Sequence, residues 1–85
     1  MKCTFGGELR RVEKRDYTTK EGKNGVSYNM LVECGVESFQ FPTVKEVFDS
    51  FTDGYINKGD NCLFEAEYNP RYQFNNFVVK TVVAQ

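Results

Sequence analysis

The sequence contains no histidine, no tryptophan and only two prolines. Its three cysteines, Cys3, Cys34 and Cys62, are odd in number and form no CxxC pair. Without histidine or paired cysteines, the usual zinc-ligand sets are missing. A secreted disulfide scaffold normally carries an even and denser set of cysteines. We therefore expect three reduced thiols, no bound metal ion and no cofactor.

Long hydrophobic runs are also missing. No segment is apolar over enough residues to span a bilayer, and MKCTFGGELRR contains no apolar stretch of the kind found in signal peptides. We expect no signal peptide, no membrane partner and a cytoplasmic location. A length of 85 residues leaves room for one core, so we expect a single domain over residues 1–85.

Groups that support catalysis are scarce. Without histidine, general acid–base chemistry would depend on carboxylates, Lys, Tyr or Cys. No Ser or Cys can have a histidine as its base, and P-loop and GxGxxG patterns are absent. Glu65 and Glu67 share one face of a predicted strand, where solvent or Lys80 is the expected neighbour. We therefore predict a binding module and not an enzyme.

Period-two alternation of apolar and polar residues predicts five strands, separated by polar segments that contain Gly, Asn or Pro. These strands are expected at residues 3–17, 26–34, 37–41, 61–69 and 77–83. The Gly6-Gly7 pair inside the first strand indicates a bulge or a sharp bend, as barrels need at their corners.

One segment, Thr43–Phe51, has a helical pattern. Thr43 is the predicted N-cap with Glu46 three residues later, and Gly54 is the predicted stop. The apolar residues of this segment recur with helical spacing and form one stripe, made of Val44, Val47, Phe48 and Phe51. We expect this stripe to face the core, together with Phe64 and Phe77.

The predicted order of elements is three strands, one helix and two further strands. This is the element order of the OB-fold, a five-stranded Greek-key barrel. We therefore predict an all-β domain with one short helix and an OB-type barrel. The alternative is a small open α+β sheet with the helix on one face. The barrel is favoured because a long, bent first strand can pair on both of its sides.

Oligonucleotides bind OB-folds across the second and third strands, between the loops of the first and last hairpins. The corresponding loops here are residues 18–25 and 69–76. Their basic and aromatic residues are Lys20 and Lys23 in the first loop, and Arg71, Tyr72 and Phe74 in the second. Positive charge and aromatic rings are the groups by which proteins bind single-stranded nucleic acid without sequence preference.

Charge is distributed unevenly along the chain, whose formal net charge is −1. Residues 1–28 contain seven basic and four acidic side chains, whereas residues 29–67 contain two basic and eight acidic side chains. This favours a polarised surface if the two ends of the chain meet in space. The acidic middle and the aromatic loops also suit a basic protein partner. An OB-fold protein-interaction module is therefore the alternative function.

The segment GELRRVEKRDYTTKEGKNGVSYNMLVE resembles the first hairpin of the small single-stranded-DNA-binding proteins of filamentous phages and related mobile elements. The resemblance implies an OB-fold, binding of single-stranded DNA during DNA replication, and a homodimer. In that family the site comprises a basic, Gly-containing first hairpin, a Tyr early in the second strand and an aromatic residue in the last hairpin. The matching positions are Arg15, Tyr17, Lys20, Lys23, Tyr28 and Phe74. The acidic balance and the NPRYQF turn depart from the family pattern.

The full predicted site consists of Arg15, Tyr17, Lys20, Lys23, Tyr28, Arg71, Tyr72 and Phe74. Tyr17 is expected to be exposed, because it ends a strand beside the charged loop. Tyr28 shares its strand phase with Met30, so it faces either the core or the ligand. If it faces the core, Asn29 and Leu31 face the ligand instead. Tyr72 and Phe74 either cap the barrel or stack on bases.

Overall fold

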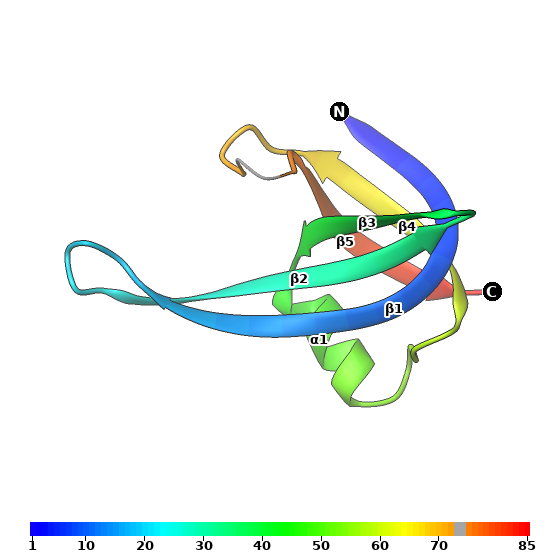
Figure 1. The fold of residues 1–85 in the computed structure, drawn as a ribbon, viewed down its shortest axis with the longest axis horizontal. Coiled ribbons are helices and arrows are strands. Elements are labelled where there is room, and N and C mark those ends of the chain that lie inside the picture. Colours follow the sequence, from blue (N-terminus) through cyan, green and yellow to red (C-terminus); the bar gives the residue numbers. More distant parts are fainter. Residues whose placement is uncertain (73–74) are drawn as a thin grey trace.

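A computed structural model describes residues 1–72 and 75–85 of the chain. All five predicted strands and the predicted helix are present, in the predicted order (Figure 1). The elements are β1 (Lys2–Thr18), β2 (Asn24–Cys34), β3 (Glu37–Thr43), α1 (Lys45–Thr52), β4 (Asn61–Tyr68) and β5 (Phe77–Ala84).

The five strands form a closed barrel in the order β1-β2-β3-β5-β4. All neighbouring strands are antiparallel except β3 and β5, which run parallel and meet at Thr43 and Val79. This is the strand order of an OB-type barrel, so the predicted all-β fold with one short helix is confirmed. The alternative of an open sheet is wrong.

The barrel closes because β1 changes partner in its middle. Residues up to Glu8 pair with β4, and residues from Glu8 onward pair with β2, with a register irregularity between Leu9 and Arg11. At this corner β1 passes very close to β2. A Cβ atom on Gly7 would lie 2.7 Å from Cγ1 of Val32, so the second glycine of the predicted bend is required by close approach.

The core fills the inside of the barrel, and its residues alternate along β2 and β4. Its buried residues are Leu9, Val12, Met30, Val32, Val47, Ile56, Cys62, Phe64, Ala66, Val78 and Val79. The ring of Phe5 stacks on both Phe64 and Phe41, with centroids 5.1 Å and 4.9 Å away. These rings extend the core along β1, β3 and β4.

The helix α1 packs against the barrel through the predicted apolar stripe. Val47 is buried, and the other three members of the stripe pack partly buried against the core. The predicted N-cap is wrong, because the cap position is Val44 and carries no side-chain hydrogen bond. Thr43 instead ends β3, where its buried Oγ1 donates a hydrogen bond to the carbonyl oxygen of Val79, 2.8 Å away. That bond joins the parallel strand pair, and Thr43 lies one residue before the cap position of the helix.

The adjacent glycines of β1 provide a matched test of the barrel corner. Gly7→Ala should lower the free energy of unfolding by about 1–3 kcal/mol, because the added methyl group overpacks a buried contact. Gly6→Ala should change it by less than about 1 kcal/mol, because the nearest atom to its Cβ would be 3.8 Å away. Urea unfolding followed by circular dichroism measures both values, and equal losses would contradict this account of the corner.

Candidate nucleic-acid interface

The β1–β2 hairpin extends beyond the barrel as a two-stranded arm, which we define as residues 15–27 (Figure 1). The β1–β4 ladder ends at Glu8 and the β2–β3 ladder begins at Tyr28, so the arm is held together by its own two strands. At the tip, the amide of Thr19 donates to the carbonyl of Lys23, and Gly22 adopts a φ of 82°. This turn leaves both predicted lysines of the loop exposed.

The β4–β5 loop lies on the same side of the barrel as the arm (Figure 1). Asparagine side chains fix its described residues. Asn76 Nδ2 donates to the carbonyl of Tyr72 at 2.7 Å, and Asn75 Nδ2 donates to the carbonyl of Gln40 on β3 at 3.0 Å. The loop is thereby anchored beside β3. Phe74, the last predicted site residue, lies outside the described residues.

A groove of about 490 Å³ lies between the arm, the β4–β5 loop and the start of α1. Four of the predicted residues line it, namely Tyr17, Tyr28, Arg71 and Tyr72. They come from three separate segments of the chain, and the closed barrel is what brings these segments together. Lys45 and Asn69 also line this groove.

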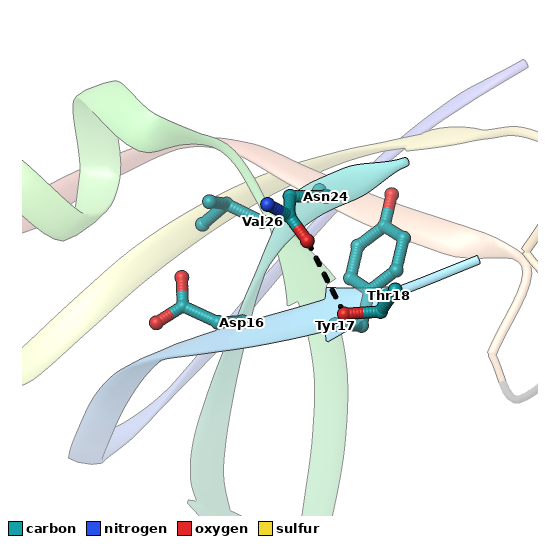
Figure 2. Close-up of a pocket in the computed structure, with 6 residues that line it drawn as sticks. Asp16, Tyr17, Thr18, Asn24 and Val26 are labelled. Carbon is teal, nitrogen blue, oxygen red and sulfur yellow. Dashed lines mark hydrogen bonds between the residues drawn. The ribbon is translucent and has the colours of Figure 1, made fainter. Parts of the chain in front are cut away.

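Tyr17 lies on the arm with half of its surface exposed, as predicted. Its partner in the β1–β2 ladder is Gly25, and its ring occupies the space where a side chain at that position would lie. Figure 2 shows the ring beside the two strands, with Asp16 pointing away from it. The neighbouring hydroxyl of Thr18 donates a hydrogen bond to Oδ1 of Asn24 at 3.2 Å and ties the two strands together here (Figure 2).

Tyr28 contacts both the core and the groove. Its side chain is partly buried, and its ring lies 5.4 Å from the ring of Phe48 on α1. It also lines the groove, so Tyr28 lies at the boundary between the core and the groove. Asn29 and Leu31 occupy the opposite strand phase and line a separate, shallow hollow on the outer face of β1, β2 and β3.

The remaining predicted cations lie along the arm and outside the groove. Arg15 precedes Tyr17 by two residues and therefore projects from the same face of β1. Lys20 and Lys23 are at the tip. Within residues 1–72 and 75–85, the basic side chains that form ion pairs are Arg10, Arg11 and Lys45. The predicted cations of the site are thus free of carboxylate partners in this part of the chain.

Lys45, the first residue of α1, lines the groove but was not among the predicted site residues. Its Nζ lies 3.1 Å from Oδ2 of Asp49, one helical turn later. The hydrogen bond to this carboxylate and its negative charge raise the pKa of Lys45 above its usual value. The position of Lys45 directly after the third strand, at the end of the barrel where the two loops meet, is the signal that could have identified it.

The cysteines are separate from the groove. Cys62 is buried, Cys3 and Cys34 are partly buried, and all three are free. Burial raises the pKa of the Cys62 thiol, which is therefore protonated at neutral pH. In the described part of the chain, Cys, Asp and Glu side chains form no group of three or more that could hold a metal ion.

No helix among the described residues has the length and apolar character needed to cross a membrane. The resemblance of the first hairpin to phage proteins stays a prediction. Comparisons of the chain with protein-family models, with curated proteins and with solved structures find no match, so the functional interpretation depends on the groove's own residues.

Proposed function

We propose that the protein binds single-stranded nucleic acid, with DNA as the expected ligand, and with little sequence preference. The observation that supports this is the groove, where three tyrosines and two basic residues from the β1–β2 hairpin, the β4–β5 loop and α1 lie together. The loops of the first and last hairpins are the segments that flank oligonucleotides in OB-folds.

The tyrosine rings are suited to stacking on unpaired bases. Tyr17 and Tyr72 are exposed over 50% and 39% of their surfaces, so part of each residue is accessible to a ligand. The ring of Tyr28 packs against that of Phe48, with centroids 5.4 Å apart, and Tyr28 also lines the groove. Stacking a base on an aromatic side chain contributes about 1–3 kcal/mol and tolerates any base, because every base has a flat π-face.

The charge of the groove is favourable although the whole chain is acidic. No acidic residue is among the described residues that line it, whereas Lys45 and Arg71 are. Asp49 pairs with Lys45 and offsets its charge, so Arg71 is the groove's unpaired cation in the described part of the chain. The exposed Glu65 and Glu67 lie on β4, outside the groove. A phosphate backbone that follows the groove onto the arm would next meet the free cations of the arm.

A second candidate function, an OB-fold protein-interaction module, is supported by a different surface. Leu63 on β4 and Val83 on β5 are cross-strand partners, and they are exposed over 40% and 55% of their surfaces. Glu65 follows on the same face of β4 and would suit a basic partner. The homodimer, the role in DNA replication and the origin in a phage or mobile element stay predictions from the resemblance alone.

A comparison of single-stranded with duplex DNA tests the proposal directly. Labelled poly-dT should bind at least about fivefold more tightly than duplex DNA of equal length, because duplex bases are stacked on each other and offer no free ring faces. Fluorescence polarisation at low salt measures both affinities. Equal binding of the two ligands, or binding of neither, would favour the protein-interaction module.

The aromatic contacts can be tested one at a time. Tyr17→Ala and Tyr72→Ala should each weaken poly-dT binding about five- to a hundredfold, because each removes one stacking surface. Tyr55→Ala is the matched control, since Tyr55 is 78% exposed and does not line the groove. Circular dichroism confirms that the variants are folded. Wild-type affinity of the two groove variants would argue against stacking at these residues.

The interaction with the phosphate backbone should appear in the salt dependence of binding. Replacing Lys20, Lys23 or Arg71 with Gln should reduce the slope of log affinity against log salt concentration by about 0.7 for each phosphate that the protein no longer neutralises. Lys58→Gln is the control, because Lys58 is an exposed lysine between α1 and β4. A slope that falls equally in all four variants would show that only overall charge matters.

A further inference from the structure

Gly25 occupies a position where backbone conformation does not require glycine. It lies within β2, and its φ is outside the left-handed region, unlike that of Gly22 in the nearby turn. Any residue can adopt an extended backbone, and glycine inside a strand is unfavourable because it packs no side chain. A glycine at such a place indicates that another group approaches the backbone closely.

The ring of Tyr17 is that group. A Cβ atom built on Gly25 would lie 2.7 Å from Cε2 of Tyr17 and closer still to Cζ. The two residues are directly opposite each other in the β1–β2 ladder. The tyrosine therefore lies across the glycine backbone, in the manner by which cross-strand aromatics compensate for strand glycines.

This contact lies outside the core. Tyr17 is half exposed, and the arm beyond Tyr28 pairs only with itself in the described part of the chain. The contact also adjoins two hollows beside the arm. One is lined by Tyr17 and Gly25 together, and the other is the groove. The geometry of the ring over Gly25 thus affects the shape of the candidate site more than the packing of the barrel.

We infer that Gly25 is a positioning residue, whose missing side chain lets the Tyr17 ring rest on the arm in the orientation that lines the groove. This inference rests on the proposed function and assigns a further residue to it. Holding a ring in its binding orientation before the ligand arrives lowers the cost of ordering it on binding. Any side chain at position 25 would displace the ring from this place.

A double-mutant cycle on poly-dT binding tests the inference. Gly25→Ala should weaken binding about fivefold or more, which is the lower bound for losing one stacked base. In the Tyr17→Ala background the same substitution should have no further effect, because its action passes through the ring. Gly6→Ala is the matched control, as a strand glycine whose Cβ would make only an ordinary contact, 3.8 Å from the carbonyl oxygen of Cys62. Wild-type binding by Gly25→Ala, or additive losses in the double variant, would overturn the inference.

A measurement without nucleic acid separates this inference from the proposed function. Proton NMR of the free protein should show nuclear Overhauser contacts between the Tyr17 ring and the Gly25 α protons, and an upfield shift of those protons that Tyr17→Ala abolishes. In Gly25→Ala the chemical shifts of the Tyr17 ring should change. If poly-dT does not bind but these signals are present, the proposed function fails and the ring is still held by Gly25. If the signals are missing in the wild-type protein, the positioning role is refuted whatever the protein binds.

Discussion

A single strand, β1, closes the barrel, because it pairs with β4 through its first half and with β2 through its second half. The change of partner occurs at Glu8, and it requires β1 to approach β2 so closely that Gly7 has no room for a side chain. Once the first half of β1 is used to close the barrel, its second half and β2 continue past the barrel wall. The arm is therefore a consequence of how the barrel closes.

The groove follows from the same closure. The parallel contact between β3 and β5, with the buried hydrogen bond from Thr43 to Val79, brings the β4–β5 loop to the end of the barrel from which the arm extends. The helix begins two residues after Thr43, at Lys45, which places this lysine at the same end. Three segments that are distant in sequence then line one groove, and packing inside the barrel determines how far apart they lie.

The sequence allowed the fold and about half of the candidate site to be predicted, and the reasons for the limit are physical. The alternation of apolar residues in strands and the apolar stripe of the helix depend on which side chains are buried, so burial can be predicted from sequence. The positions of the loops follow from the order of the elements. Contacts between distant residues leave no such pattern. Thr43 matched a capping motif, but its hydroxyl bonds to a strand 36 positions away. The pairing of Tyr17 with Gly25, and the exposure of Lys45 to the groove, likewise depend on which segments meet in space.

The net charge of the chain is a poor guide to what the groove can bind. A charge acts on a ligand over about one Debye length, roughly 8–10 Å at physiological salt, so distant carboxylates are largely screened. The acidic residues of β4 are not among the described residues that line the groove, and Asp49 is engaged with Lys45. Arg71 lines the groove itself, and the cations of the arm continue from it. The arm also contains Asp16 and Glu21, so the positive excess beside the groove is small, but it is opposite in sign to the net charge of the whole protein.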